Sequence, residues 1–356
     1  MENHNLKTGW LEELLHLQNK ITSAPIPSDL KIQLQDAIHD VKTKLEAASF
    51  SCCDPLQSLS CNKKTGKFAY VANFGSDTVS VIDTSSNTVV ATVPVGVAPS
   101  SVAVTPNGKF VYVANSGNAT VSVIDTSSNT VVATVPVGVI PLGVAVTPNS
   151  KFTYVTNAGS NTVSVIDTSS NTVVATVPVG VAPFNVAITG NGKFAYVTNF
   201  GSATVSIIDT SSNTVTTTVS VGSGPVGVAI TPNEKFAYVT NVANNNISVI
   251  DTSSNTVVAT VPVGSAPDFI AITPNEKFAY VTHFISSNVS VIDISSNTVI
   301  TTIAVGSSPL GLAITPNGKI VYIANFGNAT VSVIDTSSNT VTATVPVGNG
   351  PFDVSI

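Results

Sequence analysis

Apolar and polar residues alternate in short runs along most of the chain, and the same run returns every 42 residues. Aspartates from Asp83 to Asp335 and prolines from Pro99 to Pro351 keep this step without insertion or deletion. Seven tyrosines mark the register most clearly: Tyr70, Tyr112, Tyr154, Tyr196, Tyr238, Tyr280 and Tyr322. A period of this length is typical of propellers and arrays in which each repeat forms one small sheet.

Each repeat divides into four strands with turn residues between them. In the repeat that begins at Pro99 we expect strands over residues 102–105, 110–114, 120–124 and 130–137. Pro136 cannot donate a hydrogen bond within a sheet, so the fourth strand should lie at an edge. Apolar residues on both faces of this strand indicate that neighbouring sheets cover both sides: Val131, Val132, Ala133 and Val135.

The length of the repeat region favours a closed ring. Residues 67–356 number 290, four fewer than seven repeats of 42, and the missing four are the Thr-Pro-Asn-Gly turn between first and second strands. The first sheet therefore lacks its own first strand, and we expect residues 351–356 to supply it and seal the ring. Residues 55–61 loosely copy the same pattern and compete for this position, although they lack the Val-Ala-Val core.

The repeats carry a family resemblance. Tyr154-Val155-Thr156-Asn157, with equivalent tetrapeptides at 196–199 and 238–241, resembles the YVTN-repeat β-propellers of surface-layer proteins and YncE-like proteins. The resemblance implies an all-β fold, namely a seven-bladed β-propeller of four-stranded antiparallel blades closed by the C-terminal strand. It says little about function, because the wider family includes cell-surface proteins, lactonase-like enzymes and domains of redox proteins.

Differences between the repeats gather at two places: the residues after the Asn of strand two, and the pair after each repeated Pro that opens strand one. In an antiparallel sheet these two places lie at the same end, so one rim of the ring should be variable and the other constant. Binding residues usually lie on loops held by a rigid scaffold. We therefore expect a binding site on the variable rim, although the same side chains could merely pack the loops: Asp77, Phe184, Asn185, Asp268, Phe269, His283, Phe284, Phe352 and Asp353.

Little in the repeats points to catalysis. His283 replaces the Asn of the other repeats, and with Asp268 it could act as a general acid and base. No nucleophile motif accompanies the pair, and a drift from Asn to His at a tolerant loop explains it equally. We predict no catalytic residue, no metal site and no cofactor, because the three ligands of a zinc or iron site are missing. The repeated aspartates are expected to cap turns.

Composition limits the partners. Only 10% of the residues are charged, no basic residue is Arg, and the net charge is −6, which argues against nucleic acid. No stretch approaches the roughly 18 apolar residues of a membrane span. We see no secretory signal at the N-terminus. The compartment stays undetermined: the cytoplasm, or a surface or coat reached by a non-classical route.

The region before the propeller (67–356) has a different composition. Apolar residues recur at helical spacing, so we expect a helical hairpin over residues 1–50, followed by a linker over 51–66 that contains Cys52, Cys53 and Cys61. We expect residues 6–48 to mediate self-association or to bind a protein partner; docking on the ring or a flexible tail are alternatives. An odd number of cysteines fits free thiols or cross-links between chains.

These features favour a non-enzymatic structural or protein-interaction scaffold in a cell-surface, coat or envelope layer. The alternative is a peptide- or carbohydrate-binding module that uses the variable rim. A lactonase-like or lyase-like enzyme is a third hypothesis.

Overall fold

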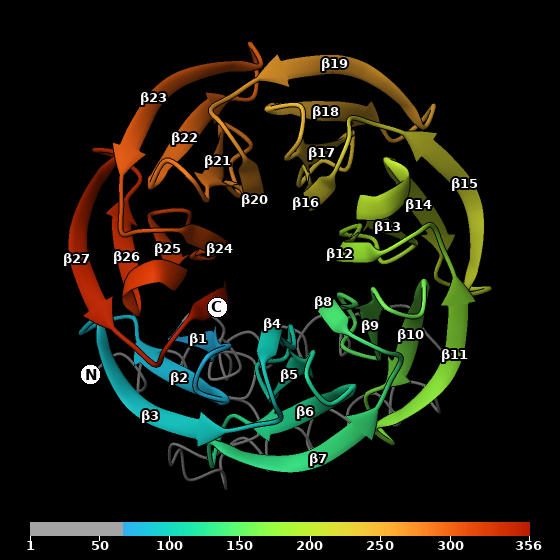
Figure 1. Ribbon diagram of the computed structural model, residues 1–356, viewed down its shortest axis with the longest axis vertical. Coiled ribbons are helices and arrows are strands. Elements are labelled where there is room, and N and C mark those ends of the chain that lie inside the picture. Colours follow the sequence, from blue (N-terminus) through green and yellow to red (C-terminus); the bar gives the residue numbers. More distant parts are fainter. Residues whose placement is uncertain (1–66) are drawn as a thin grey trace, which may run out of the picture. The chain divides into compact units, whose positions relative to one another are not determined.

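The computed structural model describes residues 67–356, which form a closed ring of seven four-stranded antiparallel sheets (Figure 1). The all-β, seven-bladed propeller expected from the repeats is thereby confirmed. The expected helical hairpin (1–50), the cysteine-containing linker (51–66) and the competing strand at 55–61 lie outside the described residues.

The strands of each blade run from the channel outward. Blade 1 contains β28 (Pro351–Ser355), β1 (Phe68–Asn73), β2 (Thr78–Asp83) and β3 (Thr88–Pro94); blade 2 contains β4 (Pro99–Val104), β5 (Phe110–Asn115), β6 (Thr120–Asp125) and β7 (Thr130–Pro136); blade 3 contains β8 (Pro141–Val146), β9 (Phe152–Asn157), β10 (Thr162–Asp167) and β11 (Thr172–Pro178); blade 4 contains β12 (Pro183–Ile188), β13 (Phe194–Asn199), β14 (Thr204–Asp209) and β15 (Thr214–Ser220).

The remaining blades follow the same order. Blade 5 contains β16 (Pro225–Ile230), β17 (Phe236–Asn241), β18 (Asn246–Asp251) and β19 (Thr256–Pro262); blade 6 contains β20 (Pro267–Ile272), β21 (Phe278–His283), β22 (Asn288–Asp293) and β23 (Thr298–Ala304); blade 7 contains β24 (Pro309–Ile314), β25 (Ile320–Asn325), β26 (Thr330–Asp335) and β27 (Thr340–Pro346). Two short 3-10 helices, η1 (Phe200–Ser202) and η2 (Phe326–Asn328), follow β13 and β25.

The C-terminal strand closes the ring as expected. β28 pairs antiparallel with β1, and Val71 lies opposite Val354 in this register. The backbone N–H of Val104 in blade 2 donates to Ser355 Oγ at 3.2 Å, so the last strand also bonds to the next blade. Figure 1 shows the C-terminus at the inner edge of the ring, next to β1.

The repeated Tyr and Asn residues join neighbouring blades. Each buried Tyr of a second strand donates its hydroxyl to the Asn that ends the Asp-Thr-Ser-Ser-Asn turn of the next blade, as Tyr112 does to Asn171 at 2.7 Å. Tyr322 closes the ring in the same way by donating to Asn87 at 2.7 Å. The one exception within the described residues is Asn129, whose Oδ1 is buried without a partner.

The outer strands differ from the expectation in one respect. In β7 only Val135 is fully buried, at 3% exposed, whereas Val132 is 53% exposed and Val131 is 36% exposed. The expectation that neighbouring sheets cover both faces of this strand is therefore wrong. The outer strands lie at the circumference of the ring (Figure 1), where the blades diverge and leave one face without a neighbour.

Candidate functional site

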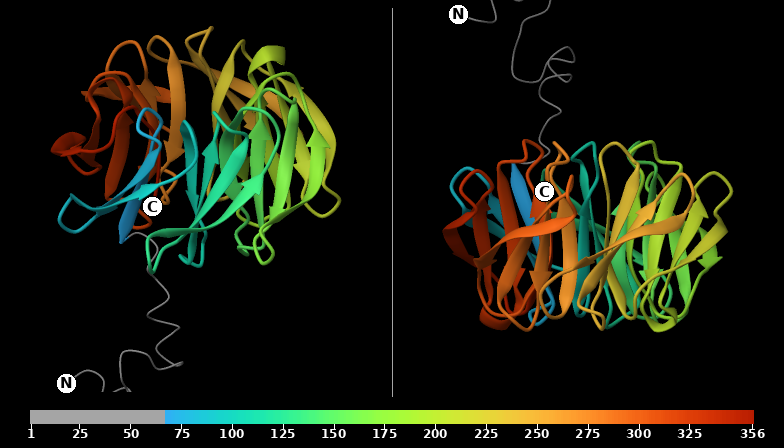
Figure 2. Two further views of the ribbon diagram at one scale, coloured as in Figure 1. Left: turned by 60° about the horizontal axis from the view of Figure 1, so that its bottom comes forward. Right: turned by 90° about the horizontal axis from the view of Figure 1, so that it is seen from above.

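The strand register fixes two different rims. Pro99 pairs with Asn115, so the opening pair of strand one and the loop after strand two share one end of the blade, as expected. Phe110 pairs with Asp125, which puts the two repeated turns together at the other end. We call these ends the variable rim and the constant rim. The views across the ring in Figure 2 show the strands running between the two ends.

Charge is concentrated on the constant rim. All seven lysines of residues 67–356 immediately precede a second strand there: Lys67, Lys109, Lys151, Lys193, Lys235, Lys277 and Lys319. The seven turn aspartates lie on the same rim, with Glu234 and Glu276. These aspartates cap their turns as expected; Asp125 Oδ1, for example, accepts the N–H of Ser127 at 2.8 Å. Hydrogen bonds from the turn serines hold the pKa of these carboxyls below the ordinary value.

The variable rim is apolar by contrast. Within the described residues its only charged side chains are Asp77, Asp268 and Asp353, and it has no lysine. Its exposed large apolar side chains are Phe74, Val97, Val139, Ile140, Val181, Phe200, Phe284 and Ile285. Ile285 is the most accessible of them, at 72% exposed. The other exposed apolar side chains of the ring lie on the outer strands.

Phenylalanines gather at the mouth of the channel on this rim. The ring of Phe269 lies 6.2 Å from that of Phe184 and 6.2 Å from that of Phe352, both in edge-on contact. The series continues from Phe184 to Phe200 at one end and from Phe352 to Phe326 and Phe74 at the other. We call these six side chains the phenylalanine arc. Edge-to-face contacts at these distances are favourable, so the arc is held by its own packing.

Repeated threonines hold the backbone of the mouth. In blade 6 the carbonyl of Asp268 accepts a hydrogen bond from Thr240 of the preceding blade. The N–H of Phe269 donates to Thr282 Oγ1 at 3.1 Å. Gly227 in blade 5 lets this backbone come close, because a Cβ there would lie 2.6 Å from the Asp268 carbonyl oxygen. The opening pair is thus fixed through main-chain atoms, which leaves its side chains free to vary.

Asp353 is used in ring closure. Its Oδ2 accepts hydrogen bonds from Ser101 Oγ at 2.7 Å and from the N–H of Val102 at 3.1 Å, both in blade 2. Burial raises the pKa of this carboxyl to about 6, although the hydrogen bonds from Ser101 and Val102 oppose the shift. The geometry therefore gives Asp353 a structural role between the C-terminal strand and blade 2.

Asp268 has a different environment. It belongs to the same kind of opening pair, but within the described residues no group donates a hydrogen bond to its carboxyl. The side chain is partly exposed, yet enough protein surrounds it that burial raises its pKa to about 7. Such a group is near half-ionised at neutral pH.

His283 lies inside blade 6 and is 0% exposed. Its Nδ1 lies 3.2 Å from the Ser265 carbonyl, which can only accept, so Nδ1 carries the proton and donates. Its Nε2 then accepts from Ser290 Oγ at 2.8 Å. Burial lowers the pKa of this imidazole, which keeps it neutral. The ring occupies the position of the Asn in the other blades and is closed off from the rim.

The remaining expected residues stay near the surface of the variable rim. Asp77 is exposed and accepts the N–H of Ala98 at 2.8 Å. Asn185 Oδ1 accepts the N–H of Val186 at 2.7 Å, and Phe284 is 39% exposed. Sequence reasoning missed Ile285 beside Phe284, because a single apolar residue in a short loop gives no periodic signal.

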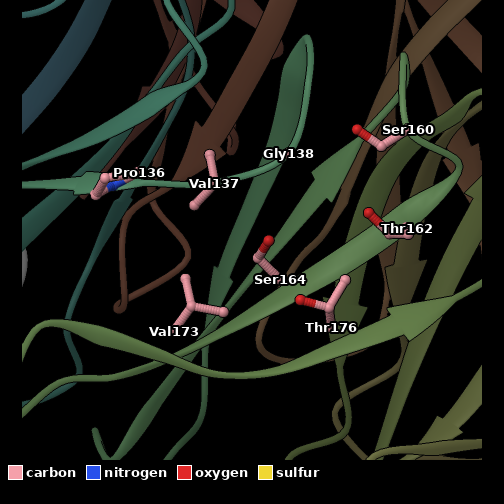
Figure 3. Close-up of a pocket in the computed structure, with 8 residues that line it drawn as sticks. All are labelled: Pro136, Val137, Gly138, Ser160, Thr162, Ser164, Val173 and Thr176. Carbon is pink, nitrogen blue, oxygen red and sulfur yellow. The ribbon is translucent and has the colours of Figure 1, made fainter.

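A separate open depression of about 380 Å³ lies between blades 2 and 3 (Figure 3). Hydroxyl groups and short apolar side chains line it: Pro136, Val137, Gly138, Ser160, Thr162, Ser164, Val173 and Thr176. None of the rim residues expected from the sequence lines it. It contains no ionisable side chain, so it can offer hydrogen bonds but no acid–base chemistry.

Residues 67–356 contain no group of three His, Cys, Asp or Glu side chains placed to hold a metal ion. Over the same residues, no helix is long and apolar enough to cross a membrane.

Comparisons with known proteins agree with the fold. Residues 149–316 match the family of YNCE-like beta-propellers, and residues 61–134 match the lactonase seven-bladed beta-propellers, which confirms the resemblance seen in the repeats. No curated protein sequence matches the chain.

Two solved structures illustrate the similarity. The hydrazine synthase of Kuenenia stuttgartiensis aligns with a TM-score of 0.72 at 25% identity, over 77% of this chain and 93% of that chain. A protein of Desulfotomaculum acetoxidans, described as functionally unknown, aligns with a TM-score of 0.72 at 18% identity, over 81% of this chain and 98% of that one.

Proposed function

We propose that this ring, similar to the YncE-like propellers, is a non-enzymatic scaffold that binds a protein partner through its variable rim. The observation that carries the proposal is the division of the ring into a charged rim and an apolar rim. Exposed apolar side chains that gather on one face of a protein are typical of interaction surfaces. Aromatic side chains such as Phe200 and Phe284 are enriched at the centres of such surfaces.

The absence of lysine from the variable rim, as far as residues 67–356 form it, also favours a protein partner. Charged residues are depleted at the cores of protein interfaces, because a charge buried without a counter-charge is costly. The lysines and most carboxylates of residues 67–356 lie on the constant rim, where their charge favours contact with water. A location in a cell-surface, coat or envelope layer, and self-association through residues 6–48, remain part of this proposal as hypotheses.

A binding screen with matched variants tests the proposal. The full chain is screened against a random peptide library, and selected peptides are measured against Ile285→Asp on the variable rim and Val258→Asp on outer strand β19. Both residues are exposed, at 72% and 54%, so neither variant should disturb the fold. We expect Ile285→Asp to weaken binding at least tenfold and Val258→Asp to leave it unchanged. Equal losses in both variants, or a library without ligands, would contradict the proposal.

A carbohydrate-binding module is the second candidate, supported by the hydroxyl-lined depression between blades 2 and 3 (Figure 3). A glycan array separates the two candidates. Under the second candidate, binding would fall when Thr176 is replaced by Val and would be unaffected by Ile285→Asp. The third hypothesis, a lactonase-like or lyase-like enzyme, has less support, because His283 is enclosed and Asp268 lies without a nucleophile. A lactone panel with His283→Ala as control tests it.

A further inference from the structure

Asp268 has the one side-chain carboxylate of residues 67–356 without a hydrogen-bond donor. The turn aspartates accept from serines, Asp77 accepts from Ala98, and Asp353 accepts from Ser101 and Val102. The two glutamates accept from Asn191 and Asn233 on the constant rim. The side chain of Asp268 thus stands unpaired in a partly buried position.

No cation of the described ring compensates this charge, since the lysines of residues 67–356 all lie on the opposite rim. A carboxylate that is buried without a counter-charge or donor destabilises the folded protein unless a ligand supplies one. The partly buried carboxyl of Asp268 is therefore available to a ligand that carries a positive group. Asp77 and Asp353, the other charged groups of this rim within the described residues, are also negative and cannot compensate it.

Asp268 lies at the same channel mouth as the phenylalanine arc. It directly precedes Phe269, whose ring contacts Phe184 and Phe352. Asp268 also occupies the repeat position that Phe184 holds in blade 4 and Phe352 holds in blade 1, two blades away on either side. The phenylalanine arc thus runs through the residue next to Asp268 in the chain, at the same channel mouth.

We propose that the channel mouth binds an alkylammonium group, with Asp268 as its counter-ion and the phenylalanine arc as its aromatic wall. The faces of aromatic rings attract organic cations, and a carboxylate beside them supplies the full charge. The inference rests on the proposed function, because it names the chemistry that a partner presents to the variable rim. The group is carried either by a lysine side chain of that partner or by a free quaternary amine.

Other cations fit less well. A guanidinium presents five N–H donors and needs several acceptors, whereas the mouth offers one carboxylate and the Asp268 carbonyl already accepts from Thr240. Calcium and magnesium require six or more oxygen ligands, while the wall here consists of hydrocarbon rings. A compact ammonium with methyl or methylene groups matches both the single charge and the apolar wall.

Calorimetric titration of the full chain with choline and with 3,3-dimethyl-1-butanol, its neutral isostere, tests the proposal. The titration is done at pH 8, where the Asp268 carboxyl is ionised. N-acetyl-lysine methylamide, titrated in parallel, distinguishes a lysine side chain from a free quaternary amine as the source. The variants are Asp268→Asn, Phe184→Leu and, as matched control on the same rim, Asp77→Asn. Thermal melting confirms that each variant is folded.

We expect choline or the lysine amide to bind and the neutral isostere to bind at least tenfold more weakly. Asp268→Asn should weaken cation binding at least tenfold, Phe184→Leu should weaken it severalfold, and Asp77→Asn should leave it unchanged. Equal binding of choline and its isostere, unchanged binding by Asp268→Asn, or no binding of either cation would overturn the inference. The scaffold proposal would survive that result if Ile285→Asp still abolished binding of the selected peptides.

Discussion

Replacing Asp268 by Asn should stabilise the protein, and the gain should grow with pH. The pKa of this carboxyl is about 7 in the folded ring against an ordinary value of 3.8. Between these values the folded state holds a proton that the unfolded state has lost, so the stability of the native protein falls as the pH rises through this window. A difference of about three pH units corresponds to about 4 kcal/mol as an upper limit, since the side chain is still partly exposed.

Guanidinium unfolding of native protein and Asp268→Asn at pH 4.5, 6 and 8 measures this effect. Asn keeps the shape of the side chain without a charge, so the difference in free energy of unfolding should be small at pH 4.5 and reach about 2 to 4 kcal/mol at pH 8. The pKa of His283 is lowered, so protonation of this imidazole at acid pH destabilises the folded protein. His283 is present in both proteins, so its contribution cancels in the difference between them. As a comparison, Asp353→Asn should show the same trend with a smaller gain, because burial raises the pKa of Asp353 only to about 6 while hydrogen bonds from Ser101 and Val102 oppose the shift. A difference between native protein and Asp268→Asn that stays constant from pH 4.5 to 8 would refute the reasoning.

Three further predictions concern the ring itself. Tyr322→Phe should lower the free energy of unfolding by about 1 kcal/mol, because it removes the hydrogen bond to Asn87 across the closing seam. Tyr70→Phe should cost less, because the equivalent acceptor, Asn129 Oδ1, makes no hydrogen bond in the native ring. Denaturant unfolding of the two variants measures the difference. His283→Asn should be tolerated and His283→Leu should cost about 1 to 3 kcal/mol by leaving a buried hydroxyl unpaired, which the same melts would show. Deletion of residues 351–356 should expose the inner edge of β1. The backbone amides of β1 should then lose protection from hydrogen exchange. Unchanged protection would contradict the idea that closure by the C-terminal strand stabilises the ring.

The architecture could be predicted because the repeats are regular to the residue. Four residues missing from seven repeats of 42 were enough to predict that 351–356 pair beside β1. The exposure of Val132 could not be predicted in this way. The strand that contains Val132 has the same alternation of apolar and polar residues whether or not a neighbouring blade covers it. Val132 is exposed because the blades diverge at the circumference of the ring.

The candidate site could be predicted only as far as its location. Asp268 and Asp353 both belong to opening pairs, but Asp268 comes first in its pair and Asp353 second, and a one-residue offset in a strand sends a side chain in the other direction. Asp353 thereby meets donors from Ser101 and Val102, about 250 residues away in the chain. A contact at that separation is set by closure of the ring, which no local pattern records.

The way the mouth is held explains why its side chains can differ from blade to blade. Thr240 and Thr282 bond to backbone atoms of Asp268 and Phe269, and Tyr322 joins blades on the constant side of the ring. Because these hydrogen bonds do not involve the side chains of the opening pair, a substitution there changes the stability of the ring little. Asp268 is the exception, since its raised pKa predicts that the ionised carboxyl weakens the fold at neutral pH. The opening pair accepts many different residues, so a destabilising residue at this position is best explained by a role in binding. The partner that suits Asp268 brings a positive charge to the variable rim, while the constant rim stays in contact with water.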